Sequence, residues 1–413
     1  MVEKFARRRT REVKVGSIGI GGDNPVRVQS MITEETAAVP KAQKQIIELH
    51  KAGAEIVRLT TPTLQDAKLL GEIKAGIQKA YGDVPLVADV HHQGSRIAVE
   101  AAKHVDKVRI NPGLFVHHKK TGRLDDYSQN EIDQQHDEIE KALKPVIEVC
   151  KDRGVAMRIG VNHGSLAERL TVMYGDTPEG MVESAMEYIR ICEANDFKDL
   201  VVSLKASRVP IMEQSNRLMA IRMDEEKMDY PIHLGVTEAG KDQYARIKSA
   251  IGIGTLLSEG IGDTIRVSLA EDPVLEIEVC NDILQALGLK KFKAEIIACP
   301  SCGRTKFDLH TVTDQVTEAT GHLKGLDIAV MGCVVNGPGE NADADYGYIG
   351  MSGGKVALQR GEERIKIVPQ EEALDELINL IKADGKWTDP PKDSSKPIPL
   401  PMAPLNRRIT FDK

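Results

Sequence analysis

The chain of 413 residues carries 55 basic and 62 acidic side chains, a formal net charge of -7. This balance argues against a nucleic-acid-binding protein that relies on a general basic surface. Hydrophobic residues make up 41% and charged residues 28%, as in soluble globular proteins, and no segment approaches the about 18 consecutive apolar residues of a membrane span. The basic N-terminus has no apolar segment behind it, so we expect a cytoplasmic protein, or one of the plastid stroma if a transit peptide has been removed.

Short runs rich in Val and Ile recur along the first two thirds of the chain, and a segment with helical spacing follows each. Eight β/α units of this size predict a TIM (β/α)8 barrel over residues 1–288. A doubly wound open sheet is the competing fold, but no glycine-rich dinucleotide motif follows the first strand. The predicted strands are Val26–Met31, Glu55–Thr60, Pro85–Val90, Lys107–Asn111, Ala156–Asn162, Asp199–Ala206, Pro231–Thr237 and Asp263–Leu269.

The pattern changes after Gly288. Residues 289–386 predict a smaller α+β domain with strands that lead into Cys299 and Cys333, a helix near Asp308–Leu323, a glycine-rich hairpin and a final helix at Glu371–Ile381. Six prolines in residues 387–413 indicate an extended tail.

Basic residues stand at or near the ends of five different predicted strands. In a barrel of this type these ends build the active site, so the five cations predict a site for a multiply charged anion such as a phosphate ester. The alternative is that some of them point outward, between the barrel and its helices. The five are Arg58, Arg109, Arg158, Lys205 and Arg266, with Asn162 and Ser268 in the same positions of their strands.

Two acidic residues, Asp89 and Glu238, end the third and seventh strands. Each is either the structural partner of the cations or a proton donor or acceptor, and the residues alone leave this open. The histidines after strand ends, at 91, 92, 117, 118 and 163, do not predict a metal site.

Six cysteines are too few for a disulfide scaffold, so we expect reduced thiols. Cys150, Cys192 and Cys280 lie on apolar helical stripes and are expected to be buried. The other three cysteines stand in two short motifs. Cys299 and Cys302 belong to Cys-Pro-Ser-Cys-Gly-Arg, and Cys333 belongs to Met-Gly-Cys-Val-Val-Asn-Gly-Pro-Gly-Glu. These three predict either a zinc site or, as the favoured alternative, an iron-sulfur cluster, for which Glu340 is a candidate fourth ligand beyond the turn.

Taken with Val-Gln-Ser-Met, Arg-Ile-Asn-Pro-Gly, Arg-Ile-Gly-Val-Asn and His-Leu-Gly-Val-Thr-Glu-Ala-Gly, the two cysteine motifs resemble the 4-hydroxy-3-methylbut-2-enyl diphosphate synthase family of the non-mevalonate isoprenoid pathway. The resemblance covers residues 10 to 385 and has the short bacterial architecture. It implies a [4Fe-4S] cluster held by Cys299, Cys302, Cys333 and Glu340. The implied activity is that of an iron-sulfur oxidoreductase, which reductively opens 2-C-methyl-D-erythritol 2,4-cyclodiphosphate.

The resemblance also implies roles for the strand-end residues. The diphosphate would be held by Arg58, Arg109, Arg158, Lys205 and Ser268, with Asp89, Asn162, Glu238 and Arg266 lining the same opening. Glu238 would be the proton source, ferredoxin or flavodoxin the electron donor, and a head-to-tail homodimer would bring each cluster domain to the other subunit's barrel.

Two other classes remain as alternatives. One is a zinc-stabilised sugar-phosphate lyase or aldolase on the same barrel, and the other is a nucleic-acid-binding module built on the Cys-Pro-Ser-Cys motif, which the net charge disfavours. His92 and the proline-rich tail have no explanation in the family pattern.

Overall fold

The computed structural model describes residues 6–90, 94–116, 127–335, 339 and 342–390. It divides into two compact units, residues 1–290 and 291–413. No helix in the described part of the chain is both long and apolar enough to cross a membrane.

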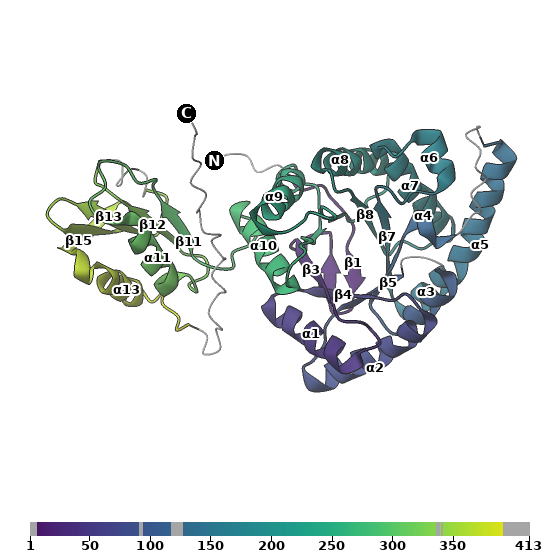
Figure 1. The fold of residues 1–413 in the computed structure, drawn as a ribbon, viewed down its shortest axis with the longest axis horizontal. Coiled ribbons are helices and arrows are strands. Elements are labelled where there is room, and N and C mark those ends of the chain that lie inside the picture. Colours follow the sequence, from purple (N-terminus) through teal and green to yellow (C-terminus); the bar gives the residue numbers. More distant parts are fainter. Residues whose placement is uncertain (1–5, 91–93, 117–126, 336–338, 340–341, 391–413) are drawn as a thin grey trace, which may run out of the picture. The chain divides into compact units, whose positions relative to one another are not determined.

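The first unit is a barrel of eight parallel strands with helices around it (Figure 1). Each predicted strand is present, so the predicted TIM barrel is confirmed. A bridge between Val202 and Ile232 joins the last pair of neighbouring strands and closes the ring. The strands are β3 (Arg27–Met31), β4 (Ile56–Thr60), β5 (Leu86–Val90), β6 (Lys107–Ile110), β7 (Ala156–Asn162), β8 (Leu200–Lys205), β9 (His233–Leu234) and β10 (Thr264–Ile265).

The strands form because they are short, apolar runs that become buried on both faces, as parallel sheets require. Every residue of β5, β6 and β8 is buried. The helices of this unit are α1 (Val39–Ala52), α2 (Leu64–Ala80), α3 (Ser95–Ala101), α4 (Pro112–Phe115), α5 (Gln129–Arg153), α6 (Glu168–Tyr174), α7 (Pro178–Ala194), α8 (Val209–Glu225), α9 (Asp242–Ser258) and α10 (Pro273–Ala286).

A short antiparallel hairpin that the sequence analysis missed packs against the barrel interior. It consists of β1 (Val13–Val15) and β2 (Ile18–Ile20), joined by a two-residue turn in which Gly16 has a φ of +58°. Its apolar side chains form one cluster with Ile56, Val87, Ala156 and Val201, which stand near the beginnings of their strands. The hairpin therefore fills the N-terminal end of the barrel, and the C-terminal end remains for a polar site.

The second unit is a five-stranded mixed sheet in sequential order, which confirms the predicted α+β domain. Its first three strands are parallel and its last three antiparallel. Side chains of α11 and α13, among them Val312, Val316, Leu377 and Ile381, form the core with one face of the sheet. The elements are β11 (Glu295–Ala298), α11 (Leu309–Thr320), β12 (Asp327–Met331), β13 (Tyr346–Met351), β14 (Lys355–Arg360), β15 (Glu363–Pro369), the 3-10 turn η1 (Gln370–Glu372) and α13 (Ala373–Ala383). Residues 391–413, most of the predicted tail, lie outside the described residues.

Candidate functional site

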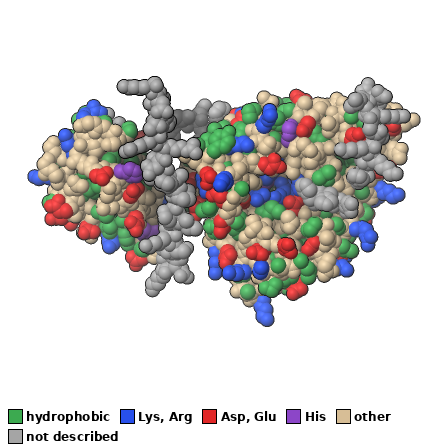
Figure 2. Space-filling view, in the orientation of Figure 1, with side chains coloured by type: hydrophobic (Ala, Val, Ile, Leu, Met, Phe, Trp, Pro, Cys, Tyr) green, Lys and Arg blue, Asp and Glu red, His purple; other side chains and the backbone are tan. Residues whose placement is uncertain are grey.

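The carboxyl ends of the barrel strands surround a polar cavity of about 110 Å³. Eight of the nine residues expected at this opening line it, all but Glu238, and because these include all five cations, the alternative in which some of the cations point outward is wrong. In the space-filling view, basic side chains are visible in a hollow of the barrel unit (Figure 2). The lining residues are Arg58, Asp89, Arg109, Arg158, Asn162, Lys205, Thr237, Arg266 and Ser268.

Asp89 is the one carboxylate among these lining residues, and two arginines share it. Arg109 Nη1 donates to Asp89 Oδ1 at 2.8 Å, and Arg58 Nη1 lies 3.5 Å from Asp89 Oδ2. Burial opposes ionisation of the carboxyl, but the charges of Arg58, Arg109 and Arg158 outweigh it and hold the pKa of Asp89 well below its ordinary value. Asp89 is therefore an ionised partner that orients guanidinium groups.

Two glycines leave space for the cationic side chains. A Cβ on Gly160 would lie 2.6 Å from Arg109 Nε, and one on Gly235 would lie 2.9 Å from Lys205 Nζ. Such distances are shorter than real contacts, so any side chain at either position would displace a cation. The glycine of Arg-Ile-Gly-Val-Asn thus leaves room for Arg109, and that of His-Leu-Gly-Val-Thr leaves room for Lys205 and for the Arg266 backbone oxygen, which would lie 2.6 Å from the added Cβ.

Arg158 and Lys205 stand buried at the centre of the site. Arg158 Nη1 donates to Ser203 Oγ at 2.8 Å, whereas its Nε and Nη2 have no hydrogen-bond partner among the described residues. Burial, followed by repulsion from the other cations, lowers the pKa of both residues well below their ordinary values. Burial likewise lowers the pKa of Arg58 to about 10, although Asp89 opposes the shift. A site with five basic groups and one carboxylate is electrostatically unbalanced until an anion enters.

Arg266 has an acidic partner that the sequence analysis missed. Its Nε and Nη2 lie 3.3 and 3.2 Å from the carboxylate of Glu276, which is buried on α10 and also accepts from the Leu269 N–H at 3.0 Å. The available signal was an acid on an otherwise apolar helix face, Pro-Val-Leu-Glu-Ile-Glu-Val-Cys. Thr237, which also lines the cavity, sits at the end of the predicted seventh strand.

Glu238 is not among the side chains that line the cavity. It follows Thr237, is exposed, and has a left-handed backbone with a φ of +53°. The structure therefore places Glu238 beside the opening rather than within the ring of cations.

The cysteines of the second unit follow the ends of two adjacent parallel strands. Cys299 directly follows β11, and Cys333 stands two residues after the end of β12. The Gly332 N–H donates to Cys299 Sγ at 3.2 Å. Cys302 is exposed, and the Arg304 backbone N–H contributes most to lowering the pKa of its thiol. Three thiols at one sheet edge, one of them already accepting a backbone N–H, suit an iron-sulfur cluster, whose sulfurs accept such bonds.

In the described part of the chain no three Cys, His, Asp or Glu side chains stand close enough to hold a metal ion. Glu340, the candidate fourth ligand, lies outside the described residues. The donor types fit a cluster, and the structure does not show these side chains gathered around one.

The remaining cysteines are buried on helices, as expected. Burial raises the pKa of both Cys150 and Cys280 to about 12, so neither is a reactive thiolate. Of the histidines after strand ends, His163 has its Nε2 atom 3.1 Å from the carbonyl oxygen of Asp176. The histidines at 91, 92, 117 and 118 lie outside the described residues.

Family models match both units: the GcpE TIM-barrel domain over residues 10–281 and the GcpE protein C-terminal domain over residues 295–383. The chain belongs to the GcpE family. It is 61% identical over 384 residues to the 4-hydroxy-3-methylbut-2-en-1-yl diphosphate synthase (ferredoxin) of Crocosphaera subtropica, with 93% of this chain and 95% of that protein covered. A protein of the same name from Synechocystis sp. is 60% identical over the same shares of both chains.

Membership of the GcpE family makes the chain an enzyme and confirms the resemblance found in the motifs. Among solved structures, a sialic acid synthetase from Leptospira borgpetersenii aligns with a TM-score of 0.43 and 14% identity, covering 68% of this chain and 90% of that one.

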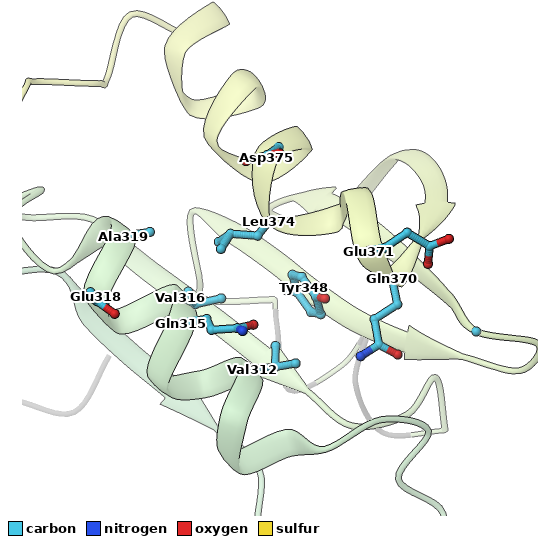
Figure 3. Close-up of a pocket in the computed structure, with 11 residues that line it drawn as sticks. Val312, Gln315, Val316, Glu318, Ala319, Tyr348, Gln370, Glu371, Leu374 and Asp375 are labelled. Carbon is cyan, nitrogen blue, oxygen red and sulfur yellow. The ribbon is translucent and has the colours of Figure 1, made fainter.

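A larger cavity, of about 740 Å³, lies in the GcpE C-terminal domain (Figure 3). Figure 3 shows Val312 and Val316 of α11, Leu374 of α13 and Tyr348 of β13 around it. Its charged lining residues are acidic: Glu318, Glu371 and Asp375. It lacks the cations that a phosphate needs, so size alone does not identify the anion site of this GcpE protein.

Proposed function

We propose that this chain reduces 2-C-methyl-D-erythritol 2,4-cyclodiphosphate to 4-hydroxy-3-methylbut-2-enyl diphosphate, with ferredoxin as the electron donor. The observation that carries the proposal is the cavity at the barrel's C-terminal end, where five basic side chains meet one carboxylate. A cyclic diphosphate that opens gains charge on its diphosphate, and such a cavity stabilises that charge. The names of the GcpE relatives support both the product and the donor.

The cations would hold the diphosphate from several strands at once. Arg58, Arg109 and Arg158 offer forked donors, and Lys205 offers a compact charge. Asn162 and Ser268 would add neutral hydrogen bonds. Because Asp89 and Glu276 already orient Arg109 and Arg266, these two guanidinium groups need little rearrangement when the substrate binds.

The cysteines would hold the redox cofactor of the reaction. Cys299, Cys302 and Cys333, with Glu340, would bind a [4Fe-4S] cluster, which supplies single electrons and a Lewis-acidic iron when bound. A carboxylate is a harder and more exchangeable ligand than a thiolate, which suits a position that a substrate oxygen must reach. Glu238 would donate the proton to the hydroxyl that leaves as water.

The proposal includes a head-to-tail homodimer, in which the cluster domain of one subunit serves the barrel of the other. Its support is the division of the chain into two compact units that carry separate halves of the chemistry.

The test is purification without oxygen. The protein should be brown, contain about four iron and four sulfide per chain, and turn over the cyclic diphosphate with reduced ferredoxin. A colourless protein with one tightly bound zinc and no reductive turnover would instead support the sugar-phosphate lyase or aldolase alternative.

A further inference from the structure

Lys107, a residue with no place in the proposed chemistry, lies inside the barrel below the cation cavity. It is two residues before Arg109 on β6, so both side chains point to the same face of the sheet. Its strand neighbours are Val87 and Ala156, which belong to the apolar cluster around the β1–β2 hairpin. Lys107 therefore lies between the floor of the barrel and the anion site.

The amine of Lys107 has no hydrogen-bond partner in the part of the chain that the structure describes. The side chain is 0% exposed, and its Nζ forms no hydrogen bond with any described residue. Other buried polar atoms of the barrel strands share this condition among the described residues: Gln29 Nε2 and Oε1, Arg158 Nε and Nη2, and His233 Nε2.

The surroundings of Lys107 are cationic. Burial lowers the pKa of its amine well below the ordinary value, and repulsion from Arg158 and then Arg58 lowers it further. An unpaired ammonium in such a place is far costlier than a neutral amine, so burial and the neighbouring cations both favour the unprotonated form. The charged or titratable groups that the barrel strands bring to the same interior are Arg58, Asp89, Arg109, Arg158, Lys205, His233 and Arg266, and Glu276 of α10 lies against Arg266.

We propose that Lys107 is a charge-compensating residue: its amine is neutral in the empty barrel and takes up a proton from solvent when a diphosphate enters the cavity. The inference rests on the proposed function, because it needs a multiply charged anion among the strand-end cations. Such an anion offsets the positive charge of the neighbouring cations, so protonation of Lys107 costs less, and an N–H bond then forms on its amine without any redox change. By linkage, the diphosphate binds more weakly as pH rises.

The experiment uses inorganic pyrophosphate as the probe. Calorimetric titrations in buffers of different ionisation enthalpy give the number of protons taken up on binding, for the wild type, Lys107→Met and Lys107→Gln. Proton exchange by the pyrophosphate itself is common to all three proteins. Both variants should take up fewer protons than the wild type, by up to one, while Lys44→Met, at an exposed lysine of α1, should match the wild type.

Apo stability gives a second, independent readout. Met has no polar group that needs a hydrogen bond, so Lys107→Met without ligand should melt no lower than the wild type. Pyrophosphate should raise the melting temperature of Lys107→Met less than that of the wild type.

Equal proton uptake in the wild type and both variants would overturn the inference, and so would loss of folding in both, because the amine would then have a structural partner. Failure of pyrophosphate to bind the wild type would overturn the proposed anion site and the inference with it. Tight binding with unchanged proton uptake would overturn the inference alone.

Discussion

Asp89 and Arg109 face each other on the neighbouring strands β5 and β6, and the carboxylate accepts from the guanidinium at 2.8 Å. In this pair Asp89 supplies the one carboxylate of a cavity wall that is otherwise basic or neutral. Asp89 thus has two effects: it stabilises the fold against repulsion among the arginines, and it reduces the positive charge available to an anion.

Replacing Asp89 with Asn should destabilise the barrel by about 3–5 kcal/mol, because it leaves buried cations unpaired. The pKa of Asp89 is lower in the folded state than the about 3.9 of an unfolded chain, so its stabilising effect is present above about pH 4 and is lost as pH falls below it. Urea unfolding across this range should show a flatter pH dependence for Asp89→Asn than for the wild type. The exposed Asp137→Asn is the control, and parallel curves for Asp89→Asn and the wild type would contradict the prediction.

Arg158→Ala should weaken pyrophosphate binding without loss of fold. The guanidinium has two donor atoms with no partner among the described residues, so it is available to a ligand. Loss of a hydrogen bond to a charged group costs about 1.5–3 kcal/mol, or about 10- to 150-fold in Kd. Arg190→Ala, which removes a surface ion pair with Glu226, should leave Kd unchanged. An unaltered Kd in Arg158→Ala would place the anion elsewhere.

The sequence predicted the eight barrel strands because continuous apolar runs are what buried parallel strands require. It could not predict the β1–β2 hairpin, since three-residue strands carry too little periodicity to be recognised, and their packing on Val87 and Val201 depends on the closed barrel. The cations of the cavity were found because each is a basic residue in or directly after an apolar strand. Lys205 ends β8 and Arg266 follows β10, whereas the other three lie within their strands. Glu276 was missed because its partner, Arg266, becomes apparent only once α10 has packed on the barrel and brought the two side chains together.

Cys333→Ala should abolish the iron and sulfide content of protein purified without oxygen, whereas Cys192→Ala should retain both. Cys333 follows β12 beside the strand that leads to Cys299, while Cys192 is fully buried among apolar side chains of α7. Iron and sulfide assays with visible absorption spectra make the comparison. Full iron content in Cys333→Ala would remove this residue from the ligand set.

Glu238→Gln should reduce turnover by about 10²- to 10⁴-fold if the carboxyl supplies the proton, because Gln keeps the shape and cannot donate it. Pyrophosphate affinity should not change, since Glu238 does not line the cavity. Steady-state turnover with reduced ferredoxin and calorimetric binding measure the two effects separately. The exposed Glu48→Gln on α1 is the control, and near-normal turnover in Glu238→Gln would exclude the role.

A mixture of Arg158→Ala and Cys333→Ala subunits tests the proposed dimer. Each variant alone should be inactive, the first for lack of an anion site and the second for lack of a cluster. In a head-to-tail dimer with one subunit of each kind, the intact barrel of the Cys333→Ala chain would meet the intact cluster domain of the Arg158→Ala chain at one of the two sites. Mixed dimers, isolated by two affinity tags, should therefore recover about half the activity of the wild-type dimer. If each chain instead combined its own two units, every site in the mixed dimer would carry one defect, and no activity would return.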